Sequence, residues 1–399
     1  MPGETTRPEG LLTDVRVIEV ALLAPSALGG HLAELGADVI KVEPGAGDYV
    51  RSIGRRPGQR GSDMHQVWNR GKRSVALDLD SEAGRRAFLR LAAGAEVVIE
   101  GRRPGYLDRR GLGYEDLLAV NPSLVFTCLS GFGESGPYRD MPSHGPAFDA
   151  YAGLAPPVTD ERGRPRIPRP GHLPVGVLTA PLYAATATLA AVLHARATGR
   201  PTRLDVAQAD AAVHARSLDI VRWRAPRTDA PADPMTKDLF HGSALVQYYR
   251  TADGGHVLFQ AMERKFFERF AALVGRPELA AEFPAGKDTD WLYGRDDVRA
   301  ALAEVFARET SAYWVELCLR HDIPCTPVNA GREVLDDPQF RARTRWLPGE
   351  GDEPSVPALP VRTTPPLPGV GPAPELGRHT TEVLAALEPG EDLRVPGAP

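Results

Sequence analysis

Short runs of β-branched and other apolar residues alternate with helical patterns through the first third of the chain. The runs cover residues 15–20, 38–42, 74–79, 96–99 and 124–128, and helical patterns lie at 27–35 and 82–92. Strands that alternate with helices predict an α/β fold with a parallel, doubly wound sheet. The turn at 22–30 lacks the Gly-x-Gly-x-x-Gly spacing that lets a backbone close around a pyrophosphate, so we predict no NAD or FAD site.

The length of the chain and a change in its texture predict two domains. One core stops growing at about 250–300 residues, and this chain has 399. A polar, Pro-rich stretch at 222–238 is typical of a linker, and a hairpin signal around 252–255 and a helical pattern at 264–274 follow it. We therefore predict residues 1–221 as the N-terminal part of a large domain, 222–310 as a linker and small α+β domain, and 311–399 as a return to the large domain with a C-terminal tail.

Charge and cysteine content exclude several classes of partner. The net charge of −5 gives no clustered positive field for nucleic acid or an anionic membrane, so neither is expected as a partner. The three cysteines, Cys128, Cys318 and Cys325, form no Cys-x-x-Cys pair, so we predict no metal site. Free cysteines and the lack of an apolar signal segment in residues 1–10 predict a cytoplasmic location.

One uncharged stretch, residues 173–193, passes the crude length test for a membrane-spanning helix. Pro174 and Pro181 would both lie inside such a span, whereas proline belongs in the first turn of a helix. A helix over 181–196 is therefore predicted, about 24 Å long and too short for a bilayer. We expect this helix to be buried in the fold.

Eight short motifs occur in order across nearly the whole chain. They are LGADVIKVEPGAGDYVR (35–51), NRGKRSVALDL (69–79), RPGYLDRRGLGYEDL (103–117), SGFGESGPYRD (130–140), LYAATATLAAVLHARATGR (182–200), YRTADGGHVLF (249–259), IPCTPVN (323–329) and ELGRHTTEVL (375–384). Together they resemble the family III CoA-transferases, the CaiB/BaiF superfamily that also contains α-methylacyl-CoA racemases. The resemblance implies a large Rossmann-like domain built from both chain ends, a small domain inserted late, and an interlocked homodimer.

The resemblance also implies that coenzyme A, carried as an acyl-CoA substrate, lies on the large domain. Arginine and lysine side chains suit its phosphates, and small turn residues leave room for adenine. The positions matched by motif are Leu23, Ala24, Arg51, Asn69, Arg70, Gly71, Lys72, Arg102, Arg103 and Arg109. The chain departs from the pattern at Gly101 and Arg102, where the family usually has Asn-Phe, so the adenine contacts are expected to differ.

The nucleophile of the family is missing. In family III transferases an aspartate attacks the acyl-CoA and forms an anhydride, which only a carboxylate can do. Val177 occupies that position here, and no Asp or Glu occurs anywhere from 162 to 204. The covalent transfer mechanism is therefore expected to be closed to this chain alone.

Two other residues match racemase positions. His144 lies where racemases carry the histidine that abstracts the α-proton of the acyl-CoA, and an imidazole is a competent base at neutral pH. Glu263 matches a racemase glutamate that reaches this histidine from the other subunit. Asp149, five residues after His144, has no counterpart in the family and is interpreted as structural.

Three functions remain open on these residues. The first is proton transfer at the carbon α to the thioester, by a racemase-like or isomerase-like reaction that uses His144. The second is CoA transfer to a carboxylic acid without an enzyme-bound intermediate. The third, of a different class, is a non-catalytic subunit in a heteromer with an Asp-bearing paralogue.

Overall fold

A computed structural model describes residues 10–55, 61–168, 174–225, 242–351 and 354–387. Its contacts divide the chain into two compact units. Unit 1 combines Met1–Ile220 with Thr344–Pro399, and unit 2 is Val221–Arg343. Residues 1–9, most of the predicted linker and the end of the predicted C-terminal tail lie outside the described residues.

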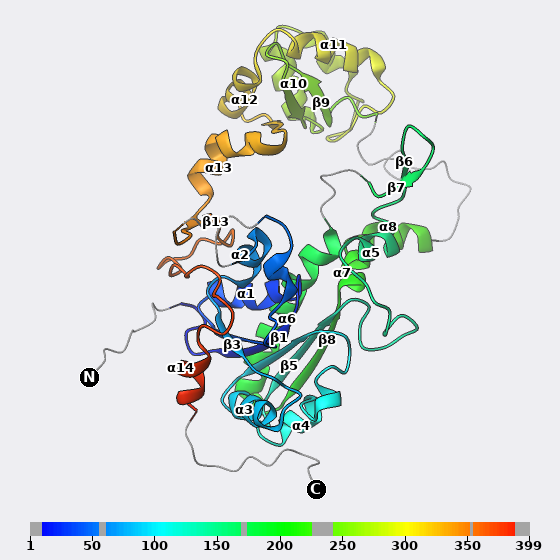
Figure 1. The fold of residues 1–399 in the computed structure, drawn as a ribbon. Helices are drawn as coiled ribbons and strands as arrows, with labels where there is room; N and C mark the ends of the chain where they lie inside the picture. The colour runs from blue at the N-terminus through cyan, green and yellow to red at the C-terminus, as the bar shows by residue number, and fades with distance from the viewer. Residues whose placement is uncertain (1–9, 56–60, 169–173, 226–241, 352–353, 388–399) are drawn as a thin grey trace. The chain divides into compact units, whose positions relative to one another are not determined.

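Unit 1 is built on a six-stranded parallel sheet in the order β3-β2-β1-β4-β5-β8 (Figure 1). The strands are β1 (Arg16–Ala21), β2 (Asp38–Glu43), β3 (Arg73–Ala76), β4 (Val97–Gly101), β5 (Val125–Ser130) and β8 (Thr202–Ala207). Each of the five predicted runs contributes one strand, and the predicted central parallel sheet is confirmed. The sixth strand, β8, was missed because alternate side chains of its sequence TRLDVA are polar and more exposed, as on an edge strand.

Helices cover both faces of this sheet, because alternate strand residues point to opposite sides. On one face, Ile18, Val98 and Phe126 pack with residues of α3 (Glu82–Ala93) and α4 (Tyr114–Leu118). On the other face, Val17 and Ile99 pack with residues of α1 (Ser26–Glu34), α6 (Val175–Thr198) and α7 (Gln208–His214). The smaller elements of unit 1 are η1 (Tyr49–Ser52), α2 (Asp63–Asn69), η2 (Asp108–Arg110), α5 (Pro146–Tyr151), β6 (Val158–Thr159), β7 (Pro165–Arg166), β12 (Trp346–Leu347) and β13 (Val356–Pro357).

Helix α6 is longer than predicted. It begins at Val175, so the prediction of a start at Pro181 was wrong, and Pro181 lies inside the helix. The helix remains continuous because Ala180, Ala184 and Val192 are buried in the core of the sheet on both sides of the proline. Within the described ranges, α6 alone is long and apolar enough to cross a bilayer by length and composition. The small residues Ala180, Ala184 and Ala191 of α6 are buried in the same core as the sheet residues Val17 and Ile99, so one side of this helix packs on the sheet.

The C-terminal segment returns to the edge of this sheet. The backbone N–H of His379 donates to Ser74 O over 3.0 Å, and the Thr380 hydroxyl accepts the Ala76 N–H over 2.9 Å. Helix α14 (Thr380–Ala385) then places Val383 in the core beside β3. Both ends of the chain therefore contribute to unit 1.

Unit 2 is an α+β unit around an antiparallel sheet in the order β11-β10-β9. Its core is rich in aromatic residues, with Phe259, Phe270 and Phe306 fully buried. Its elements are β9 (Gln247–Arg250), β10 (His256–Phe259), α10 (Arg264–Leu273), η3 (Pro277–Glu282), α11 (Asp296–Phe306), α12 (Ser311–Arg320), β11 (Cys325–Pro327), η4 (Gly331–Asp336) and α13 (Pro338–Arg343). Helix α8 (Ser217–Arg224) spans the boundary between the units.

Unit 2 extends past the predicted boundary at 310, up to Arg343. The reason is that β11 pairs with β10, so the chain after 310 completes the small sheet before it leaves. The alternation of apolar residues in this short strand was too weak to reveal the pairing from the sequence.

Candidate functional site

The carboxyl ends of β1 and β4 form the point at which the strand order of the sheet reverses. Ligands of open α/β sheets bind in the crevice outside such a switch point. Here the backbone N–H of Leu22 donates to Gly101 O over 3.2 Å, which joins the turn after β1 to the end of β4. A Cβ on Gly101 would lie 2.5 Å from Ala21 Cβ and 2.7 Å from Pro25 Cβ, so only glycine allows this approach.

The turn between β1 and α1 is held in an unusual backbone conformation. Leu23 has a φ of +55°, in the left-handed region that a branched residue rarely adopts. The Asp48 carboxylate accepts the Leu23 N–H at 3.1 Å, and the Lys41 ammonium in turn lies 3.1 Å from Asp48. Strained turns of this kind cluster at ligand sites. The predicted residues Leu23 and Ala24 therefore lie on a fixed, charged support at the switch point.

That support is a buried network of charges beneath the turn. Glu19 lies between two lysines, with its carboxylate 3.2 Å from Lys41 Nζ and 2.8 Å from Lys72 Nζ, and all three side chains are fully buried. Burial lowers the pKa of Lys72 to about 8, although Glu19 acts in the opposite direction. Burial would also lower the pKa of Lys41, but attraction to Glu19 and Asp48 outweighs it and raises that pKa. The Lys72 ammonium also donates to Ser26 O and to Asn69 Oδ1, at 2.6 and 2.9 Å.

Arg51 also belongs to this internal network. Its guanidinium donates two hydrogen bonds to the Glu43 carboxylate, at 2.7 and 3.0 Å, and a third to Pro374 O at 2.9 Å. Burial would raise the pKa of Glu43, but the hydrogen bonds from Arg51 and the charge of Lys41 lower it to about 2. Burial, together with the charge of Arg51, lowers the pKa of the neighbouring His65 to about 4.

Arg70 is paired in the same way with the buried Glu34 carboxylate, and it also donates to Val67 O at 2.6 Å. The four predicted CoA contacts Arg51, Asn69, Arg70 and Lys72 therefore have internal partners and form the scaffold under the turn. Gly71 has a φ of +75°, and a Cβ there would lie 2.9 Å from Val370 Cβ. Its position is thus also explained by local packing.

The arginines of the loop after β4 are differently placed. Arg103 and Arg109 are exposed, and the Arg102 guanidinium lies 4.2 Å from the centroid of the Tyr106 ring. Across the described parts of the chain, none of these three has a carboxylate partner. Burial, with a smaller effect of Asp48, raises the pKa of Tyr49, and the charge of Arg102 opposes this shift. Of the predicted cations, these three are available to an anionic ligand.

A second feature is an apolar cluster at the start of α6. Val177 is nearly buried and shares this cluster with Ala24 of the β1–α1 turn and Phe148 of α5. Trp68 and Phe132 pack against its edge. The structure therefore brings two predicted positions, Ala24 and Val177, together within unit 1. Residue 177 lies in the first turn of α6, where the helix dipole favours a carboxylate, yet valine presents none.

A carboxylate does reach the start of α6, but it comes from α5. The buried Asp149 side chain accepts the backbone N–H of Val175 at 2.7 Å and that of Gly176 at 2.9 Å. These are two of the N–H groups that the first turn of a helix leaves without partners. Both oxygens are therefore engaged, as expected of a structural residue. This contact could not be predicted from local sequence, because Asp149 and Val175 are 26 residues apart.

His144 lies in the loop that leads to α5 and is exposed. Its backbone O accepts the Ala147 N–H at 2.8 Å. The next residue, Gly145, would place a Cβ 3.7 Å from Val177 Cγ2, so the His144 loop lies against the start of α6. Glu263 lies in unit 2, immediately before α10, and forms an ion pair with Lys265 at 3.0 Å. Its role across a dimer remains a prediction.

Comparison with known proteins identifies the family of this chain. The family model described as CoA-transferase family III matches residues 12–380. A succinyl-CoA–L-malate CoA-transferase beta subunit of Chloroflexus aurantiacus is 31% identical over 405 residues, which cover 97% of this chain and 96% of that protein. A succinyl-CoA:mesaconate CoA-transferase of Haloarcula marismortui is 30% identical and covers 94% of this chain and 96% of its own.

The solved structures that match include a CaiB/BaiF family protein from Brucella suis, with a TM-score of 0.76 and 27% identity. The match covers 96% of this chain and all of that one. The resemblance carried by the eight motifs is thereby confirmed over nearly the whole of this chain. This chain belongs to CoA-transferase family III.

Proposed function

We propose that this chain binds an acyl-CoA and uses His144 to move the proton on the carbon α to the thioester, without an enzyme-linked aspartyl intermediate. The observation that carries this proposal is the environment of residue 177. An apolar side chain occupies the first turn of α6, and the carboxylate that reaches this turn, Asp149, is buried with both oxygens engaged by backbone N–H groups. A buried carboxylate that caps the first turn of α6 in this way is held in a structural role and is not presented to a thioester.

The proposed CoA site is the crevice beyond the carboxyl ends of β1 and β4, where the strand order of the sheet reverses. The phosphates of CoA would pair with Arg102, Arg103 and Arg109, while the turn at Leu23 and Ala24 forms the wall of the crevice. Ala24 contributes to the same apolar cluster as Val177, which supports a thioester that reaches from this crevice toward the His144 loop. In the interlocked homodimer that we expect, Glu263 of the partner subunit would complete the site.

The test is exchange of the α-proton of a 2-methylacyl-CoA in deuterated water, followed by mass spectrometry. We expect exchange with the wild type and a loss of at least about 100-fold with His144→Ala, the usual contribution of a general base. His194→Ala, a change at an exposed histidine of α6, is the matched control and should keep the wild-type rate. Full exchange in His144→Ala would refute the role of His144. CoA transfer to a carboxylic acid without exchange would favour direct transfer.

A second candidate function is that of a subunit that supports an Asp-bearing paralogue. It is favoured by the relative from Chloroflexus aurantiacus, which is named as one subunit of a two-subunit enzyme. In that case the purified chain alone should neither exchange the α-proton nor transfer CoA. When the two proteins are expressed together, this chain should copurify with the paralogue. Activity of the isolated homomer would refute this candidate.

A further inference from the structure

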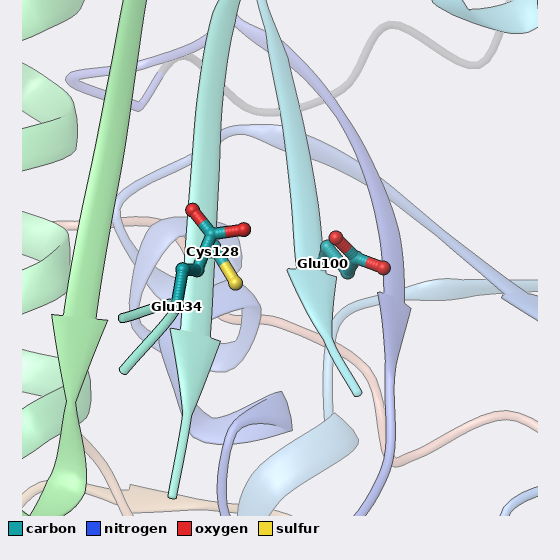
Figure 2. A group of neighbouring side chains, drawn as sticks. All are labelled: Glu100, Cys128 and Glu134. Atoms are coloured by element: carbon teal, nitrogen blue, oxygen red, sulfur yellow. The ribbon is translucent and has the colours of Figure 1, made fainter. Parts of the chain in front are cut away.

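Three side chains that bind metal ions in other proteins meet at the carboxyl end of β4 and β5, outside the site described above. Glu100 and Cys128 are paired in register on these two neighbouring strands, and Glu134 lies in the loop that follows β5 (Figure 2). One carboxylate oxygen of each glutamate and the Cys128 sulfur all lie within 4.8 Å of one another. We propose that Glu100, Cys128 and Glu134 form a site for one thiophilic divalent cation of the zinc type.

The state of Glu100 is the first argument for a ligand. Its side chain is fully buried, and one oxygen accepts the Leu107 N–H at 2.8 Å. The other oxygen, Oε2, is buried without a hydrogen-bond partner among the described residues. A buried carboxylate oxygen without a partner is costly. A cation coordinated at this position would supply the missing interaction.

The charge around the thiol is the second argument. The carboxylates that act on Cys128 are Glu134, Glu100 and Asp205, and the opposing cation is Arg203. Arg203 is already committed to Glu134, to which it donates two hydrogen bonds at 2.6 and 3.1 Å. Asp205 accepts the Glu134 N–H at 3.0 Å, which fixes the loop over the strands. Carboxylates therefore exceed cations here. Arg203 also orients Glu134 by hydrogen bonds, as neighbouring groups commonly orient the carboxylates that bind a metal.

The geometry suits a small cation after a modest contraction. Zinc binds sulfur at about 2.3 Å and carboxylate oxygen at about 2.0–2.2 Å in tetrahedral arrangements, so its ligand atoms lie about 3.5 Å apart. The observed spread, at most 4.8 Å, requires movements of roughly 1 Å. Glu134 lies on a loop and can make such a movement. Three protein ligands leave the fourth position for water.

Protonation competes with the metal at this site. Burial, with smaller effects of Asp108 and Glu134, raises the pKa of Glu100 to about 7, and burial raises the pKa of the Cys128 thiol far above its usual range. A dication that binds here has to compete with protons for these two groups, so its affinity should rise with pH. The prediction of no metal site rested on the absence of a Cys-x-x-Cys pair. The ligands proposed here come from three separate segments, so they form no such local motif.

The test uses Cd²⁺ and Zn²⁺ as probes on the full chain. We expect equilibrium dialysis to show one zinc ion per chain, and titration with Cd²⁺ to give ultraviolet absorption from a thiolate-cadmium bond. Cys128→Ser should abolish that band. Cys318→Ser removes the thiol beside Cys325 in unit 2, controls for cadmium bound there, and should keep the band.

Glu100→Gln is the second variant, because its side-chain oxygen can still accept the Leu107 N–H and preserve the loop. We expect its zinc affinity to fall by at least about 100-fold while its circular dichroism spectrum is unchanged. Absence of binding to the wild type, wild-type zinc affinity in Glu100→Gln, or a cadmium band that persists in Cys128→Ser would each overturn the proposal.

Discussion

Replacing Asp149 by asparagine should loosen the start of α6 while leaving the volume of the side chain unchanged. The carboxylate accepts two backbone N–H groups, at 2.7 and 2.9 Å, in a fully buried position. An amide keeps one acceptor oxygen and turns an N–H₂ group toward the other backbone donor. A hydrogen bond to a charged group contributes about 1.5–3 kcal/mol. Loss of one such bond, with a buried donor left unpaired, should cost about 3 kcal/mol, or roughly 100-fold in the opening equilibrium.

Hydrogen exchange measured by mass spectrometry reads this change at the helix itself. In Asp149→Asn, peptides that contain Val175 and Gly176 should exchange faster by roughly 100-fold, and the free energy of unfolding in urea should fall by about 3 kcal/mol. Asp140→Asn is the matched control, because Asp140 lies in the loop that precedes α5 and its side chain is 80% exposed. If Asp149→Asn behaved like this control in both measurements, the assignment of Asp149 as the cap of α6 would be wrong.

The elements that the sequence predicted correctly are those with a local signal. β1, β2 and β5 are buried on both faces, as expected for a parallel sheet, and β-branched residues recur in all three. β8 is an edge strand with partly exposed polar residues, so it lacked that signal. The start of α6 was placed at Pro181 because proline favours first turns, but tertiary packing of Ala180 and Ala184 outweighed that preference.

The site was only partly predictable for a similar reason. The sequence identified Arg51, Arg70 and Lys72 as cations near the turn, but it could not separate a phosphate contact from a buried ion pair. Their acidic partners lie in other elements: Glu43 pairs with Arg51, Glu34 with Arg70 and Glu19 with Lys72. The last two pairs join residues that are far apart in the sequence. The loss of the nucleophile at Val177, by contrast, is a property of one position in a motif, and it was visible in the sequence.

Three further predictions follow from the charges of the site. Glu19→Gln should lower the free energy of unfolding by about 3–5 kcal/mol, because it leaves the buried Lys41 and Lys72 without their shared carboxylate; a urea midpoint equal to that of the wild type would contradict this. Burial lowers the pKa of His65 and that of His31, a residue of α1, to about 4. Between about pH 6.5 and pH 4 the unfolded chain therefore binds protons at these positions more readily than the folded one, so the free energy of unfolding falls as the pH is lowered through this range. Each histidine accounts for up to about 3 kcal/mol, and urea titrations of wild type and His65→Gln over this range should show a smaller loss in the variant. Arg103→Ala should weaken CoA binding about tenfold, measured by calorimetry, and leave the free energy of unfolding unchanged. Arg70→Ala should instead lower the free energy of unfolding, because it breaks the buried pair with Glu34. The reverse pattern would refute the division between exposed and buried cations.

The central claim, that no carboxylate of this chain forms a covalent link with the acyl-CoA, is tested most directly by intact-protein mass spectrometry. Wild type and Val177→Asp are incubated with acyl-CoA and then treated with hydroxylamine, which converts an enzyme thioester to a hydroxamate of distinct mass. Val177→Asn serves as the control of similar size that cannot form an anhydride. We predict no modification of the wild type or of Val177→Asn, and a hydroxamate at residue 177 in Val177→Asp. A hydroxamate on any carboxylate of the wild-type chain would contradict it.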